Sequence, residues 1–460
     1  MKASIDSRIF YHIYPLGMCG CPPQNDFSSP AGSGLREIEG HLDRIANLGV
    51  NALYIGPLFE STAHGYDTLD YFHVDRRLGN NDDLIRLVSA CHDRGIAVVL
   101  DAVLNHVGRH FFAFKDLQQK GRESSYQSWF AGVDFSRRSP AGDPFHYEGW
   151  SGHYDLVKLN TGNPDVANHL FSAVKFWMEE FHIDGLRLDA ADVLEGGFMD
   201  SLSSFCRGIN PDFWLMGEVV HGDYRNWARP GRLDSVTNYE AYKGLWSSFN
   251  DKNMFEIAWS LNRQFGNEGM YRDFLPYNFA DNHDVPRVAS VLKDPAHLYP
   301  LYGLLAAMPG IPSLYYGSEW GLRGEKKEGS DRQLRPRIES PSAEQAVSRI
   351  DRNCAPATDY RALEEAIRHV FRIRKENAAL RNGGFVPVHT SALQYAFIRS
   401  NPEQTILAAV NADGSAQEIS VAIPEGVWQD LLDASCTIEA RRGGAKVSIP
   451  ANWIRLLRKL

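Results

Sequence analysis

Charged side chains within the segment FHIDGLRLDAADVL (181–194) point to chemistry rather than to packing. Arg187 and Asp189 lie two residues apart in an apolar strand pattern, so their side chains share one face of the strand. Charged groups are rarely buried without a partner and a purpose. We therefore interpret this pair as a carboxylate that is kept ionised by a neighbouring guanidinium inside an enclosed site.

Other polar residues stand where further apolar segments end. Glu218 lies in the apolar context LMGEVV, which favours a protonated carboxyl group. Hydrolysis of a glycosidic bond with retention needs two carboxyl groups about 5–5.5 Å apart. One is ionised and acts as the nucleophile, and the other acts first as an acid and then as a base. For each residue alone, a structural ion pair is the alternative. The further candidates at segment ends are Asp101, His106, His283 and Asp284.

The elements that must position these residues alternate between strand and helix patterns. Helical spacing occurs at 35–49, 82–95 and 164–181. Eight strands alternating with helices predict an α/β protein with a (β/α)₈ barrel, and an open doubly wound sheet is the alternative. The expected strands are 8–15, 51–59, 96–103, 185–191, 213–220, 233–240, 274–284 and 311–319.

Composition changes along the chain predict three domains. The catalytic barrel is expected at 1–106 and 164–382, and the aromatic-rich segment 107–163 is too long for a simple loop and predicts an inserted domain. Short strands separated by turn residues predict an antiparallel β-sandwich over 383–460. The pairs Asp413-Gly414 and Gly443-Gly444 are hairpin signals within it.

Bulk properties restrict the class of ligand. The net charge of −9 and the isoelectric point near 6.0 argue against nucleic acid as a partner. The apolar run 301–317 is broken by Pro309 and Pro312, so no membrane partner is expected. No signal-peptide pattern and six scattered cysteines favour a cytoplasmic protein.

Four segments resemble, in order, the four conserved regions of the α-amylase superfamily of glycoside hydrolases (glycoside hydrolase family 13). They are DAVLNH (101–106), GLRLDAA (185–191), GEVV (217–220) and FADNHD (279–284). The segment GYDTLDY (65–71) is similar to a substrate-ring motif of that family. The resemblance covers the barrel, the inserted B domain and the terminal β-sandwich.

The resemblance implies a role for each matching residue. Asp189 would be the nucleophile, Glu218 the general acid/base, and Asp284 the residue that binds sugar hydroxyls and stabilises the transition state. A surface position is the alternative for His221. The residues expected to bind or position the substrate are Tyr66, Asp101, His106, Arg187, His221, His283 and Arg287.

Finer features resemble the neopullulanase and cyclomaltodextrinase group. LVKLN (156–160) is similar to its MPKLN segment, and Ala190 fits a preference for α-1,4 bonds. That group carries an amino-terminal domain that builds dimers, whereas the first barrel strand is expected by residue 8 here, so both a monomer and a homodimer stay open. No cofactor is expected to be required; calcium at Asn105 is an alternative, as is a loop-bracing role for Asn105.

These observations predict a retaining hydrolase that cleaves α-1,4 bonds of maltooligosaccharides and maltodextrins, with cyclodextrins and starch as further substrates. A 4-α-glucanotransferase or an α-glucosidase of the same superfamily is the alternative. A binding-only, transporter-associated barrel is a remote alternative, because such relatives lack the catalytic carboxylates that are present here. No separate starch-binding module is evident, which favours small soluble substrates.

Overall fold

The largest sheet of the protein is a closed parallel barrel. The computed structural model describes residues 5–327 and 330–460. Eight parallel strands are hydrogen-bonded in the order β11-β10-β9-β5-β2-β1-β13-β12. Thr237, which follows β11, bridges Tyr277 of β12, so the two ends of the sheet meet. This closure confirms the (β/α)₈ prediction and excludes the open sheet. The strands are β1 (Phe10–Ile13), β2 (Ala52–Ile55), β5 (Ala97–Ala102), β9 (Gly185–Leu188), β10 (Trp214–Gly217), β11 (Ser235–Val236), β12 (Tyr277–Phe279) and β13 (Ile311–Tyr315).

Capping residues set the starts of the helices that separate these strands. Asn80 and Asp83 form a capping box at the start of α4 (Asn81–Asp93). Asn163 caps α6, whose first residue is Pro164. The other longer helices are α5 (Phe112–Lys120), α7 (Gly196–Ile209), α8 (Tyr239–Asn250), α9 (Phe255–Phe265), α11 (Leu298–Ala307) and α13 (Tyr360–Glu376), and α6 ends at Glu180.

The helix expected over 35–49 is in fact two short helices. They are α2 (Gly34–Gly40) and α3 (Leu42–Asn47). The backbone N–H of His41 bonds the carbonyls of Ile38 and Glu39, which ends α2 in a tighter turn. The apolar spacing survives this break, because Leu35, Ile38, Leu42 and Ile45 are all fully buried.

The chain forms two compact units. Unit 1 comprises 1–12, 43–52 and 237–460, and unit 2 comprises 13–42 and 53–236. Within unit 2, β5, β9 and β10 are aligned so that Asp101 lies level with Arg187, and Arg187 lies level with Met216. Residues that are level in neighbouring parallel strands face the same side. This register therefore brings the polar ends of three strands together.

The segment after β5 folds around its own aromatic core. It contains α5 and a small sheet of β6 (His106–Gly108), β8 (His153–Lys158) and β7 (Gly149–Trp150), in that order. Phe114, Phe145 and Tyr147 are fully buried and contact one another through their ring edges and faces. His106 pairs in register with Lys158, so this insert is tied directly to a predicted site residue.

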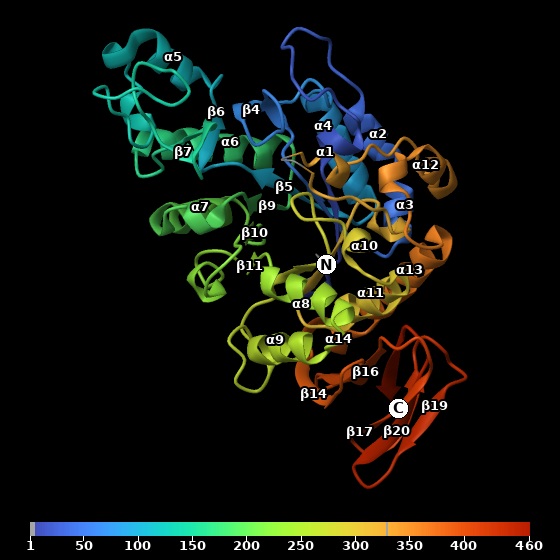
Figure 1. Cartoon of the computed structure of the whole chain (residues 1–460). Coiled ribbons are helices and arrows are strands. Elements are labelled where there is room, and N and C mark those ends of the chain that lie inside the picture. The colour runs from blue at the N-terminus through green and yellow to red at the C-terminus, as the bar shows by residue number, and fades with distance from the viewer. Residues whose placement is uncertain (1–4, 328–329) are drawn as a thin grey trace. The chain divides into compact units, whose positions relative to one another are not determined.

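The C-terminal strands form two antiparallel sheets, drawn in red in Figure 1. One sheet has the order β14-β15-β16-β21-β18-β19, and the other pairs β17 with β20. Trp428, Leu407, Ile419 and Val447 lie in the core that these sheets share. The strands are β14 (Gly384–Thr390), β15 (Gln394–Ser400), β16 (Thr405–Asn411), β17 (Gln417–Ala422), β18 (Gly426–Asp430), β19 (Thr437–Ala440), β20 (Gly444–Ile449) and β21 (Trp453–Lys459).

Strands β18 and β19 pair with each other at one edge of the larger sheet. One feature of this region corrects the sequence prediction. Asp413-Gly414 joins β16 to β17, which belong to different sheets, so this turn does not form the expected hairpin. Over the residues that the structure describes, no helix is long and apolar enough to cross a membrane.

Candidate active site

One arginine contacts three carboxylates in unit 2. Nη1 of Arg187 lies 2.8 Å from Oδ1 of Asp189 and 2.8 Å from Oδ1 of Asp101. Nη2 of the same side chain lies 2.8 Å from Oε2 of Glu218. Arg187 is only 2% exposed, so these contacts are shielded from water. The geometry brings together the two carboxyl groups that the sequence assigned to bond cleavage.

Burial dominates the electrostatics of this cluster. It raises the pKa of Asp189 well above the usual aspartate range. The Arg187 guanidinium opposes this shift, whereas the Glu218 and Asp101 carboxyls add to it. Burial thus works against the ionisation that the sequence predicted for Asp189, whereas Arg187 favours it.

Asp101 is held by two tyrosines as well as by Arg187. The hydroxyl of Tyr54 on β2 donates to Oδ2 of Asp101 at 2.7 Å, and that of Tyr66 donates to the same oxygen at 3.1 Å. Sequence reasoning missed Tyr54. The sequence signal for Tyr54 is a hydroxyl group within the apolar strand ALYI, just as a charged group within an apolar strand identified Arg187.

The backbone N–H of Ala190, the residue after the candidate nucleophile, points toward the candidate acid Glu218. Ala190 has a φ of 46°, in the left-handed region that side-chain-bearing residues rarely adopt. Its N–H donates to Oε2 of Glu218 at 3.2 Å. Residues held in this region occur at functional sites when the surrounding structure enforces them. The conformation of Ala190 thus contributes one hydrogen bond to the candidate acid.

His106 is a buried, neutral donor next to Asp189. Its Nε2 lies 3.8 Å from Oδ2 of Asp189, and its ring centroid lies 5.7 Å from that of Trp150. Burial lowers the pKa of His106 to about 3, and the nearby His64 adds to this shift. A neutral imidazole presents one N–H donor and one acceptor, which suits a sugar hydroxyl.

A tight loop presents Tyr66 between β3 (Phe59–Ser61) and β4 (Thr68–Val74). Gly65 has a φ of 88°, and a Cβ there would lie 2.8 Å from Cγ of Pro57, so glycine is required. The carboxylate of Asp67 accepts hydrogen bonds from the backbone N–H groups of Ala63 and His64. The Tyr66 ring is therefore held on a rigid support.

His283 and Asp284 lie in unit 1, after β12. Nε2 of His283 is 2.9 Å from Oδ2 of Asp284. Arg335 donates from Nε to the carbonyl of His283 at 3.0 Å and from Nη2 to Oδ1 of Asp284 at 3.1 Å. Sequence reasoning missed Arg335, and no local pattern identifies it, because 51 residues separate it from Asp284.

Arg287 is a correction to the expected substrate-binding set. Its side chain is completely buried, and Nη1 donates to the carbonyl of Tyr316 and to Oγ of Ser318. Nη2 donates to the carbonyl of Leu334, and the guanidinium stacks over the Tyr315 ring. Burial keeps the Arg287 guanidinium away from a sugar, so it braces the loop that follows Asp284.

His221 and Asn105 do not join the carboxylate cluster. His221 is exposed, and no contact with the other candidate residues of the described chain holds it at the site. Nδ2 of Asn105 lies 3.2 Å from Nδ1 of His106, and its backbone carbonyl accepts from Leu159. Within the described ranges, no three His, Cys, Asp or Glu side chains are grouped as a metal site. Calcium also binds amide and carbonyl oxygens, so calcium at Asn105 stays a prediction.

Comparison with known proteins identifies the family of this chain. The model of the α-amylase catalytic domain matches residues 24–366. The chain belongs to the α-amylase family. It is an α-glucan hydrolase of that family, and its catalytic domain contains the carboxylate cluster described above.

Several members of the α-amylase family are similar over most of this chain. A Bacillus sp. cyclomaltodextrinase is 31% identical over 434 residues, covering 89% of this chain and 74% of the relative. The intracellular maltogenic amylase of Bacillus subtilis (strain 168) is 33% identical over 338 residues, covering 70% and 56%. The ligand-free cyclic α-maltosyl-(1→6)-maltose hydrolase of Arthrobacter globiformis has a TM-score of 0.81 at 27% identity, with 99% of each chain covered.

Proposed function

We propose that the protein is a retaining hydrolase of α-1,4-linked maltooligosaccharides and maltodextrins. The observation that carries the proposal is the contact of Arg187 with both Asp189 and Glu218, each at 2.8 Å. Because Nη1 contacts Asp189 and Nη2 contacts Glu218, the guanidinium keeps the two carboxyl groups close together. Retaining enzymes place these groups about 5–5.5 Å apart, and the shared cation supports such an arrangement.

In the first step, the ionised carboxylate of Asp189 attacks the anomeric carbon of the sugar. The bond to the leaving oxygen breaks as Glu218 transfers its proton to that oxygen. His106 hydrogen-bonds a sugar hydroxyl and Tyr66 stacks on the ring. The role of Asp284, to bind hydroxyls and stabilise positive charge at the anomeric carbon, rests on the family resemblance alone. The product is a shortened glucan and a glycosyl ester of Asp189.

In the second step, Glu218 accepts a proton from water. The oxygen of that water bonds to the anomeric carbon while the ester bond to Asp189 breaks. The sugar is released with its original α configuration, and both carboxyl groups return to their starting states. Arg187 neutralises the Asp189 carboxylate each time it is released, which lowers the cost of a buried charge.

A time course on maltoheptaose tests the proposal, with β-cyclodextrin and cyclic α-maltosyl-(1→6)-maltose in parallel and the product anomer read by NMR. We expect shorter α-anomeric products, and none from Asp189→Asn. Products longer than seven units would favour the glucanotransferase, and β-anomeric products would overturn the mechanism. Turnover of neither linear nor cyclic α-glucan would overturn the substrate class. Similarity to relatives named cyclomaltodextrinase supports including cyclic substrates.

We also propose that the protein acts in the cytoplasm on soluble oligosaccharides. Similarity to a relative named intracellular maltogenic amylase supports this location. Fractionation of cells that express the protein tests it: activity in the culture medium or the membrane fraction would contradict it.

A further inference from the structure

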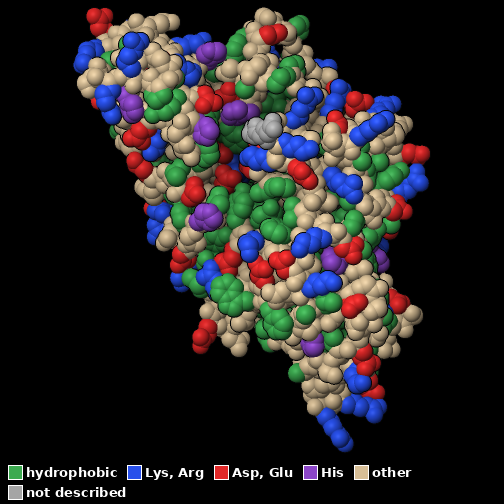
Figure 2. Space-filling model, viewed as in Figure 1, with side chains coloured by type: hydrophobic (Ala, Val, Ile, Leu, Met, Phe, Trp, Pro, Cys, Tyr) green, Lys and Arg blue, Asp and Glu red, His purple; other side chains and the backbone are tan. Residues whose placement is uncertain are grey.

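Helix α9 presents two aromatic side chains to solvent. Phe255 is 54% exposed and Trp259 is 64% exposed, one helical turn apart on the same face. Hydrophobic side chains are visible at the surface over α9 in Figure 2. The guanidinium of Arg263 lies 5.6 Å from the centroid of the Trp259 ring, next along this face. Large exposed aromatics beside polar groups are typical of binding surfaces.

A groove of about 580 Å³ lies where α9 ends. One wall is formed by the end of α9 and the loop after it, and the other by β14, which is in contact with α9. Both walls belong to unit 1. Its lining residues are Asn262, Arg263, Asn267, Glu268, Met270, Phe385, Val386 and Pro387.

Three polar side chains of the groove have no intramolecular role. Asn262, Asn267 and Glu268 are exposed, and their side chains make no hydrogen bond with any residue that the structure describes. Two amides and a carboxylate together offer both donors and acceptors, as hydroxyl groups require. Arg263 differs, because its guanidinium is held by Glu240.

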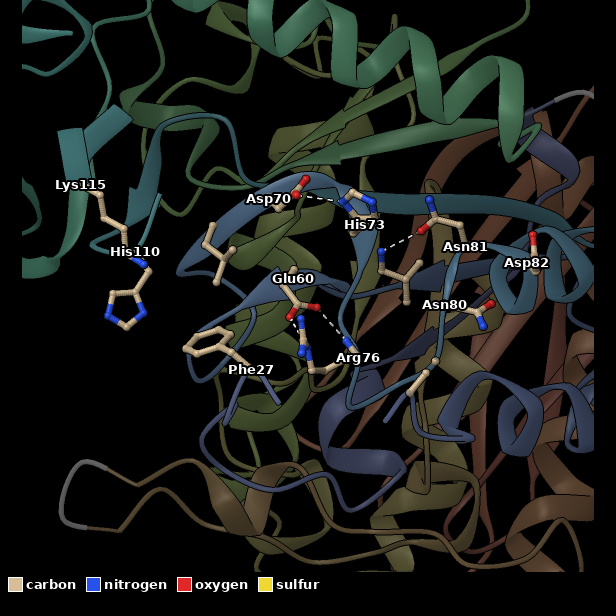
Figure 3. Close-up of a pocket in the computed structure, with 14 residues that line it drawn as sticks. Phe27, Glu60, Asp70, His73, Arg76, Asn80, Asn81, Asp82, His110 and Lys115 are labelled. Carbon is tan, nitrogen blue, oxygen red and sulfur yellow. Dashed lines mark hydrogen bonds and ion pairs between the residues drawn. The ribbon is translucent and has the colours of Figure 1, made fainter. Parts of the chain in front are cut away.

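A larger cavity lies near β4. It has a volume of about 780 Å³, and Figure 3 shows several of its polar residues paired with one another. Glu60 pairs with Arg76 and Asp70 with His73, while Asn81 bonds the backbone of Val74. Four of its charged or ionisable side chains are thus already partnered, and the exposed aromatic face lies beside the groove of α9 instead.

We propose that the Trp259 face and the groove form a second α-glucan-binding site, separate from the residues that cleave the chain. A glucose ring has an apolar face that stacks on an aromatic ring, and hydroxyl groups that bond amides and carboxylates. Small-ligand sites combine concave apolar surface with a few polar groups in this way. The identity of the ligand as an α-glucan rests on the proposed function.

The exposed apolar area is too small for a stable dimer interface. Phe255, Trp259 and Val386 are 54%, 64% and 44% exposed. Full areas of about 150–250 Å² per side chain, multiplied by these exposed fractions, give roughly 300 Å² of exposed apolar surface. A standard interface needs about 800 Å² from each partner. A chain of a few sugar units fits this area, and a second protein copy does not.

Affinity electrophoresis through amylopectin tests the site. All proteins carry Asp189→Asn, so that the polysaccharide is not digested and binding at the cleavage site is the same in each. We expect Trp259→Ala to raise the dissociation constant for amylopectin about 3–10-fold, the scale of one aromatic stacking contact. Trp259→Phe should restore most of the binding, and Asn262→Ala with Asn267→Ala should weaken it. Val427→Ala, which changes an exposed side chain on β18, is the matched control and should bind normally.

Two further measurements separate the outcomes. With Asp189 intact, Trp259→Ala should hydrolyse maltotriose at the wild-type rate, which shows that the fold is intact. Equal retention of Trp259→Ala and the parent protein overturns the second site, even when hydrolysis of maltoheptaose upholds the proposed function. If Trp259→Ala weakens retention but the protein with Asp189 intact hydrolyses no α-glucan, the second site is upheld and the proposed function is overturned. A change from dimer to monomer in sedimentation, caused by Trp259→Ala, would assign the face to self-association and overturn the proposal.

Discussion

The backbone N–H of Ala190 lies 3.2 Å from Oε2 of Glu218, and Ala190 reaches this position with a φ of 46°. The residue directly after the candidate nucleophile thus positions the candidate acid. Arg187 contacts the same oxygen of Glu218 at 2.8 Å. Both donors therefore fix the position of this Glu218 oxygen beside the turn that follows Asp189.

Substitution of Ala190 by valine should impair this arrangement. A β-branched side chain strongly disfavours the left-handed region, so Ala190→Val should cost about 1–3 kcal/mol of unfolding free energy or force the N–H away from Glu218. We expect kcat on maltoheptaose to fall more than KM rises. Ala190→Gly adopts the same backbone conformation freely and is the matched control, with near wild-type kcat. Wild-type kcat in Ala190→Val would show that the hydrogen bond has no catalytic value.

The rate should depend on pH through Asp189. Burial raises its pKa, and Arg187 partly opposes this. Because the nucleophile must be ionised, kcat/KM should fall as pH decreases through a value above the ordinary aspartate range. Arg187→Lys opposes the shift less well, since lysine lacks the planar fork. We expect its acidic limb to move to higher pH, with a rate loss of about 10²–10³. An unchanged acidic limb would show that Arg187 does not control this ionisation.

Asp189→Asn should raise the stability of the protein. The raised pKa of Asp189 means that its ionised form disfavours the folded state at any pH above that pKa. The increase in Tm should therefore be a few degrees at neutral pH and should disappear in acid, where the carboxyl is protonated. Asp200→Asn is the control and should lower the Tm at neutral pH, because hydrogen bonding from Arg232 lowers the pKa of Asp200. A lower Tm for Asp189→Asn at neutral pH would contradict this account.

Substitution of Arg335 should lower the catalytic rate, whereas substitution of Arg287 should lower the stability of the fold. Arg335→Met removes a donor from Asp284, and we expect kcat to fall about 10-fold or more, short of the 10²–10³ typical of losing the group itself. Arg287→Met removes a fully buried guanidinium that binds backbone carbonyls and lies near Asp281, and should cost about 3 kcal/mol or more. Chemical denaturation and steady-state kinetics on both variants check this. A larger loss of kcat in folded Arg287→Met would return Arg287 to the substrate site.

Local patterns predicted the barrel strands better than the C-terminal region. Barrel strands are runs of buried residues, as in β5, where every side chain is buried. Strands β18 and β19 are short and half exposed, so their pattern resembles the turns around them. The helix over 35–49 kept its apolar spacing but broke at His41, which spacing alone does not reveal.

The sequence by itself predicted the α/β barrel, with an open sheet as the alternative, and the pairing of Arg187 with Asp189, because alternation along one strand places both side chains on one face. The tertiary structure alone decided their partners. Tyr54 meets Asp101 across 47 residues and Arg335 meets Asp284 across 51, and pairing at such separations depends on register rather than on local pattern. The same applies to the burial of Arg287 and the exposure of Trp259, since a helix or loop residue is covered only by what the rest of the chain packs against it.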